Sequence, residues 1–243
     1  EAVRHAAALE TRSSRESMPW RWPPRLGARV RLLVEQVEVN RSRPPVRERS
    51  RDAKGLPVPT PLHGDSSSWT VHVAGFRGPA PGLVARVLML AGGRMGYHVQ
   101  LRMVPAPIGA GRRAWAQVTF SRPRTEREAA GTSTVIPWGE ADLLLGVDRV
   151  ESLLAVSPDE LLRVASPGRT RGVVNIGLFE DQQDREVASQ RVGEIADHFR
   201  QLLHPDGQVI EDFSDLGRWR FHNERLSDLV QLGTAFQMGA VPL

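Results

Sequence analysis

The stretch that decides the fold reads Val71-His72-Val73-Ala74-Gly75-Phe76-Arg77-Gly78-Pro79-Ala80-Pro81-Gly82 and continues to Gly96-Tyr97. The apolar run that ends at Ala74 predicts a strand, and the glycines and prolines behind it predict a tight turn. After the turn, apolar residues recur at helical spacing, so we expect a helix whose apolar face holds Leu83, Val84, Val87, Leu88, Leu90 and Ala91. A strand, a turn and a helix in this order predict the opening of a parallel α/β unit.

A turn of this kind can bind phosphate when its glycines let the backbone approach the ligand and the helix offers free N–H groups. Here Pro79 and Pro81 remove two of those N–H donors. The pattern therefore favours an ordinary βα turn over a dinucleotide site. Gly75, Arg77 and Gly78 are the candidate cofactor contacts of this turn.

Composition limits the chemistry. The 243 residues include no cysteine, which excludes a disulfide, a thiolate nucleophile, a Cys-ligated zinc site and a Cys-held iron–sulfur cluster within this chain. No run of about 18 apolar residues is present, so the sequence predicts no membrane span. The lack of disulfides fits a reducing compartment, and we expect a cytoplasmic protein.

Charge divides the chain into two parts. The formal net charge is +4, but residues 1–65 carry +5 and residues 66–243 carry −1, and Lys54 is the only lysine. We therefore expect a basic, Pro- and Arg-rich N-terminal arm or linker over 1–65 and an α/β domain over 66–243. Residues 26–39 fit a helix and a strand equally well, and the arm fits both a docking segment and a disordered linker. Nucleic-acid binding through this arm is the least favoured function, because the body is nearly neutral.

The body alternates strands and helices. We expect strands at 98–104, 114–120, 141–146, 172–176 and 208–210, and helices at 150–156, 158–164, 185–203 and 223–238, with 217–222 as a connection. Ser157 and Pro158 supply a cap and a first-turn proline for the helix at 158–164. This order predicts a mainly parallel sheet flanked by helices.

Histidines and acids give weak signals of chemistry. The seven histidines show no metal-ligand spacing, and His72 and His98 lie in predicted strands, where we expect packed residues. Glu140 and Asp142 flank the start of a buried strand, and we interpret them as solvated acids at a loop-to-strand junction. We expect no catalytic residue and no metal ligand in this chain.

Two further positions could contact an anion. Gly111, Arg112 and Arg113 place two guanidinium groups on a glycine loop, a pattern that suits a phosphate or a carboxylate as well as a solvated edge. Asn175 ends a predicted buried strand, where α/β sheets place ligands.

Four segments together resemble the gamma subunit, or gamma-type domain, of the 2-oxoacid:ferredoxin oxidoreductases. They are Gly75 to Ala80 with Gly96-Tyr97-His98-Val99, the Ala110-Gly111-Arg112 loop that runs into 114–120, Gly139-Glu140-Ala141-Asp142-Leu143-Leu144-Leu145-Gly146 with Glu151, and Asn223 with Leu232-Gly233 and Val241-Pro242-Leu243. The resemblance covers about residues 71–243. Its most specific parts are the Glu-Ala-Asp strand and the closing helix.

Departures from the family pattern fall in the loops. Arg77 and Ala80 replace two glycines of the family's first turn, and Ala110 replaces the arginine of its second loop. The resemblance implies a subunit that is not catalytic on its own, in a complex with alpha- and beta-type subunits. Those partners bind thiamine diphosphate and the iron–sulfur clusters that reduce ferredoxin, and the gamma-type domain can line the approach of coenzyme A. The alternatives are a stand-alone nucleotide-binding α/β protein and the nucleic-acid binder.

Overall fold

The computed structural model describes residues 58–64, 66–75, 80–104, 114–123, 125, 127–128, 133–160, 163–177 and 192–243. The chain divides after Leu56, and every described residue belongs to the second unit, Pro57–Leu243. The predicted arm over 1–65 lies almost entirely outside the described residues and stays a prediction.

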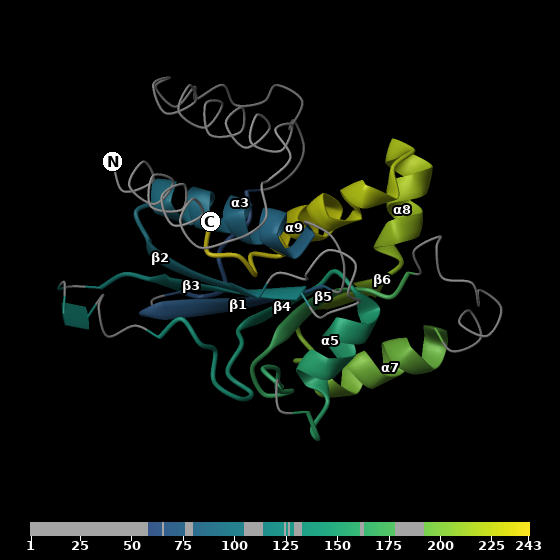
Figure 1. The fold of residues 1–243 in the computed structure, drawn as a ribbon, viewed down its shortest axis with the longest axis horizontal. Helices are drawn as coiled ribbons and strands as arrows, with labels where there is room; N and C mark the ends of the chain where they lie inside the picture. Colours follow the sequence, from purple (N-terminus) through teal and green to yellow (C-terminus); the bar gives the residue numbers. More distant parts are fainter. Residues whose placement is uncertain are drawn as a thin grey trace, which may run out of the picture. The chain divides into compact units, whose positions relative to one another are not determined.

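A six-stranded sheet in the order β2-β3-β1-β4-β5-β6 organises this unit (Figure 1). Its strands are β1 (Ser68–Gly75), β2 (His98–Val104), β3 (Ala114–Ser121), β4 (Leu143–Gly146), β5 (Arg171–Asn175) and β6 (Gln208–Glu211). Parallel pairing joins β1 to β4, β4 to β5 and β5 to β6, whereas β3 pairs antiparallel with both β1 and β2. Only β3 therefore runs against the rest of the described sheet, and the predicted mainly parallel α/β fold is confirmed.

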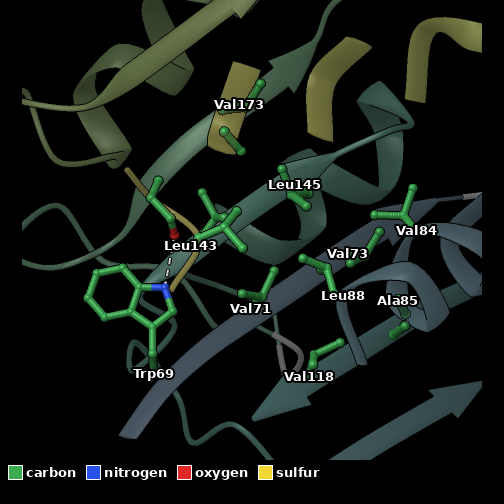
Figure 2. Packing of buried hydrophobic residues seen from close by; sticks show 14 of the residues in the cluster. Trp69, Val71, Val73, Val84, Ala85, Leu88, Val118, Leu143, Leu145 and Val173 are labelled. Atoms are coloured by element: carbon green, nitrogen blue, oxygen red, sulfur yellow. Dashed lines mark hydrogen bonds between the residues drawn. The ribbon is translucent and has the colours of Figure 1, made fainter. Parts of the chain in front are cut away.

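The helices cover both faces of the sheet. They are α3 (Ala80–Arg94), α5 (Arg149–Val156), α7 (Val192–Leu202), α8 (Phe213–Phe221), the short 3₁₀ segment η2 (Glu224–Leu226) and α9 (Ser227–Gln237). Figure 1 shows α3 and α9 on one face and α5 and α7 on the other. Strand alternation serves both layers, because Trp69, Val71 and Val73 of β1 face the α3/α9 core while Ala74 joins the α5/α7 core. Figure 2 shows the first of these cores.

The closing segment is held to the start of β1. The Trp69 indole N–H donates to the Ala240 carbonyl at 2.9 Å, and Val241 is 1% exposed in the α3/α9 core. Gln231, in the first half of α9, bonds the Gly146 carbonyl at the end of β4, and Ala240, just after α9, bonds Trp69 at the start of β1, so the helix runs antiparallel to these strands. Its N-terminus therefore lies at the carboxyl edge of the sheet.

The face that α3 buries differs from the expected one. Val84 and Leu88 are fully buried as predicted, but Leu83, Val87 and Leu90 are exposed. The sequence of α3 is apolar nearly all around the helix, so helical periodicity alone does not select the side that packs on the sheet.

The helix expected at 158–164 is wrong for its described residues. Pro158 and Asp159 form a turn, closed by the Glu160 N–H on the Ser157 carbonyl at 3.2 Å. Ser157 does not cap a new helix, because its hydroxyl donates back to the Leu153 carbonyl of α5 at 2.7 Å. Conversely, α8 occupies the segment that we expected to be a connection.

The remaining elements lie close to their predicted ranges. Helix α7 covers the described part of the helix expected at 185–203, and η2 with α9 covers the one expected at 223–238. Among the described residues, no helix combines the length and the apolar character needed to cross a bilayer.

Candidate functional site

The topology of the sheet marks one place for a ligand. After β1 the chain crosses to α3 on one face, and after the neighbouring strand β4 it crosses to α5 on the other face. In open α/β sheets, ligands bind outside the carboxyl ends of strands at such a switch point. The candidate site is therefore the rim beyond Gly75 and Gly146, which we call the carboxyl rim.

Of the predicted loop residues, Gly75 lies at this rim. Gly75 pairs with Ala114, the residue after Arg113, so the turn that follows β1 and the loop that precedes β3 both connect to the same edge. Arg77 and Gly78, like Gly111, Arg112 and Arg113, lie outside the described residues, and their ligand contacts stay predictions.

Gly75 is needed for close packing. A Cβ atom at this position would collide with the ring of Pro81, which is buried in the first turn of α3. Gly75 is not among the residues with positive φ, so it supplies space and not an unusual backbone conformation. The proline ring thus packs against the strand end and brings no N–H group to the start of α3.

Two other helix N-termini at this rim, those of α5 and α8, are capped by the chain's own carboxylates. Asp148 caps α5 and accepts from the N–H groups of Val150 at 2.9 Å and Glu151 at 3.0 Å. Asp212 caps α8 and accepts from the Asp215 N–H at 2.7 Å. Both carboxylates use the N–H groups that would otherwise bind a phosphate, and their charge opposes an incoming anion.

Asn175 lies at the carboxyl end of β5, as predicted, and both polar atoms of its side chain form hydrogen bonds within the protein. Its Oδ1 accepts from the N–H groups of Gly177 and Phe213, both at 3.0 Å, and its Nδ2 donates to the Ser214 hydroxyl at 2.8 Å. The residue is 0% exposed. This geometry gives Asn175 the role of joining β5 to the start of α8.

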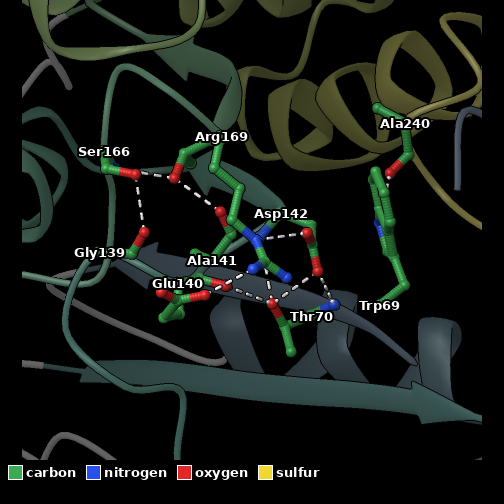
Figure 3. Close-up of polar contacts among 10 residues, drawn as sticks. Trp69, Thr70, Gly139, Glu140, Ala141, Asp142, Ser166, Arg169 and Ala240 are labelled. Carbon is green, nitrogen blue, oxygen red and sulfur yellow. Dashed lines mark hydrogen bonds and ion pairs between the residues drawn. The ribbon is translucent and has the colours of Figure 1, made fainter. Parts of the chain in front are cut away.

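The two acids at the start of β4 lie at the opposite edge of the sheet (Figure 3). Asp142 accepts from the Thr70 N–H at 2.8 Å and from Arg169 Nε at 2.8 Å, and Glu140 pairs with Arg169 Nη1. The bond to Asp142 raises the pKa of the Arg169 guanidinium. The expectation of two solvated acids is wrong for Asp142, which is buried and ion-paired. This network joins the amino ends of β1, β4 and β5.

His72 faces a small cavity between β1, β3 and α5. The cavity holds about 20 Å³, enough for one water molecule, and is lined by His72, Trp115, Gln117, Glu151, Leu154, Ala155 and Val164. Gln117 accepts from the Ile136 N–H at 3.1 Å, so its amide nitrogen faces His72 Nδ1 at 3.5 Å and the imidazole proton lies on Nε2. Burial lowers the pKa of His72 to about 4. The packed role predicted for His72 is confirmed, whereas His98 is exposed.

Two buried polar residues of α9 were missed from the sequence. Gln231 is 1% exposed, and its Nε2 donates to the Gly146 carbonyl at 2.8 Å, beside the carboxyl rim. Asp228, one turn earlier, is buried beside Ser227, and this burial raises its pKa to about 6. The sequence held a signal for them, because Asp228 and Gln231 are polar residues at i and i+3 and so lie on one face of the expected helix.

No group of three metal-binding side chains occurs in the part of the chain that the structure describes. The expectation of no metal ligand in this chain stays a prediction.

Comparisons with protein-family models and with curated proteins find no match. Among solved structures, the chain is similar to a pyruvate oxidoreductase subunit from Thermotoga maritima, with 15% identity over 69% of this chain and 74% of that one and a TM-score of 0.42. It is also similar to the gamma subunit of a keto/oxoacid ferredoxin oxidoreductase from Geobacter sulfurreducens, with 16% identity over 68% and 73% and a TM-score of 0.39. Similarity at this level does not assign an activity.

Proposed function

We propose that this chain is a gamma-type subunit of a thiamine-diphosphate-dependent 2-oxoacid:ferredoxin oxidoreductase and that its role there is mainly structural. The observation that carries the proposal is the position of the two most specific segments of the sequence resemblance. Asp142 joins the amino ends of β1, β4 and β5, and the closing helix packs on the core through Val230, Leu232 and Ala235. Both segments thus contribute contacts that hold the sheet and its helical layer together.

The carboxyl rim supports a subunit that does not bind the cofactors itself. The chain has no cysteine for an iron–sulfur cluster, so its residues do not fit that group. Asp148 and Asp212 already bind the N–H groups of two helix starts, and Pro81 fills the turn beside Gly75, so these described residues do not fit a diphosphate either.

Coenzyme A is the ligand that we propose this chain helps to position. In this proposal, Arg77, Arg112 and Arg113 line its approach from the loops next to the carboxyl rim, because guanidinium groups pair with phosphates. Partner subunits supply the thiamine diphosphate and the clusters.

Reconstitution tests the proposal. Purified alpha- and beta-type subunits should reduce ferredoxin with a 2-oxoacid at a full and lasting rate only when this chain is added. Full turnover by a stable complex that lacks the chain would contradict the proposal. Calorimetric titration of this chain with dinucleotides tests the alternative hypothesis, because a stand-alone nucleotide-binding protein must bind one of them.

A further inference from the structure

Helix α3 presents an apolar stripe away from the sheet. Leu83, Val87 and Leu90 follow the i, i+4, i+7 spacing of one helix face and are between 38% and 49% exposed. The helix already buries a second apolar face, through Val84 and Leu88. A helix that is apolar on both sides is typical of one that is covered on both sides.

Helix α9 repeats this arrangement beside it. Leu229, Gly233 and Phe236 have the same i, i+4, i+7 spacing, and Leu229 and Phe236 are 43% and 39% exposed. The only charged residue of α9 is Asp228, which is buried, so the outer face of this helix carries no charge at all. Helices α3 and α9 contact one another on the same face of the sheet, and we call their two exposed stripes together the α3/α9 face.

Gly233 lies within this surface without a structural reason inside the chain. A Cβ atom added there would meet no atom within 4 Å, and the residue does not adopt a positive φ. Glycine inside a helix costs roughly 1 kcal/mol relative to alanine. A bare backbone at this point lets another chain approach α9 closely.

Charge indicates what kind of chain covers the face. Helix α3 contains no acid, and its exposed Arg86 and Arg94 make no ion pair or hydrogen bond with any described residue. A second copy of this chain, paired through the same two helices, would offer these arginines no exposed carboxylate, because α3 has no acid and the single acid of α9, Asp228, is buried. A different protein with an apolar surface and carboxylates at its rim satisfies both the stripe and the charge.

We propose that the α3/α9 face is the docking surface for a catalytic partner subunit, whose contacting surface is apolar and rimmed by carboxylates. This inference rests on the proposed function for the identity of the partner. It goes beyond that function because it assigns the contact to particular residues, on the helical layer and not on the loops of the carboxyl rim.

The test measures the affinity of the full chain for the purified alpha- and beta-type subunits. Val87→Glu places a charge in the stripe, and Val150→Glu, at an exposed apolar position of α5 on the other face of the sheet, is its matched control. We expect Val87→Glu to weaken binding by about tenfold or more and Val150→Glu to change it by less than about twofold.

Gly233→Ala distinguishes an effect on docking from an effect on folding. The substitution should raise the Tm of the free chain, because alanine favours the helix, yet weaken the complex. Gly193→Ala in α7, where the added Cβ also meets open space, should leave binding unchanged.

Each outcome has one meaning. Equal binding by Val87→Glu and Val150→Glu would overturn the docking surface and leave the proposed function standing. Absence of binding by the unmodified chain would overturn both. Self-association that Val87→Glu abolishes would assign the face to a second copy and overturn the inference.

Discussion

At the residue scale, burial sets the chemistry of His72. Its imidazole makes one long hydrogen bond to Gln117 and lines a cavity that fits one water molecule. A neutral ring is stable in this setting, and a charged ring is not.

We expect His72 to reduce stability in mild acid. Its folded pKa of about 4 lies below the ordinary histidine value of 6.5, so the contribution of the neutral ring to stability is fully present above pH 6.5 and is lost as pH falls toward 4. The loss over this window is on the order of 3 kcal/mol. Urea unfolding at pH 7 and pH 4.5 checks this, and His72→Gln should remove that share of the decrease. An identical decrease in the variant would contradict the expected role.

Asp228 has the opposite pH dependence. Burial raises its pKa from 3.8 to about 6, so the folded state binds the proton more tightly and stability is lost as pH rises from 3.8 through 6. Asp228→Asn should therefore stabilise the chain by on the order of 2 kcal/mol at pH 7 and by little at pH 3.5. The measurement is the free energy of unfolding at both pH values, and a variant less stable at pH 7 would show that the charge itself is needed.

At the element scale, the start of α3 depends on the contact between Gly75 and Pro81. Gly75→Ala should destabilise the chain by about 1–3 kcal/mol, because the added methyl group collides with the proline ring. Denaturant unfolding measures the effect. The double variant Gly75→Ala with Pro81→Ala should recover part of the loss, and no recovery would place the strain elsewhere.

The sequence predicted most elements because their patterns are local. Strand β2 was predicted residue for residue, and β1, β3 and β5 lie within a few residues of their expected bounds. Helix α8 was missed because charged residues and Gly217 interrupt its apolar pattern. The helix expected at 158–164 was wrong because Ser157 was interpreted as the N-cap of a new helix. In the structure, Ser157 instead caps the end of α5.

The carboxyl rim was predictable only in part. The sequence showed that prolines remove N–H donors from the turn after β1, and it placed Asn175 at a strand end. The cap by Asp148 was readable but not predicted, because an Asp before an expected helix is a common N-cap. The sequence could not show that Pro81 packs on Gly75 or that Gln231 reaches the Gly146 carbonyl. These contacts join residues far apart in the chain or depend on the exact angle at which a helix leaves its strand.

At the scale of the whole molecule, the two edges and the outer helical layer have different roles. The amino edge is held by Arg169 with Glu140 and Asp142, whereas at the carboxyl rim Asp148 and Asp212 cap α5 and α8, and Pro81 packs on Gly75. The α3/α9 face, with its exposed apolar stripes, is the surface that we propose for a protein partner. This distribution fits a subunit whose function lies in assembly.

The mass of the complex tests the central claim most directly. The full chain would be co-expressed with the alpha- and beta-type subunits and measured by size-exclusion chromatography with light scattering. The account predicts one species that contains all three subunits in fixed proportion. Elution of this chain alone, at a mass near its own 26.9 kDa, would contradict it.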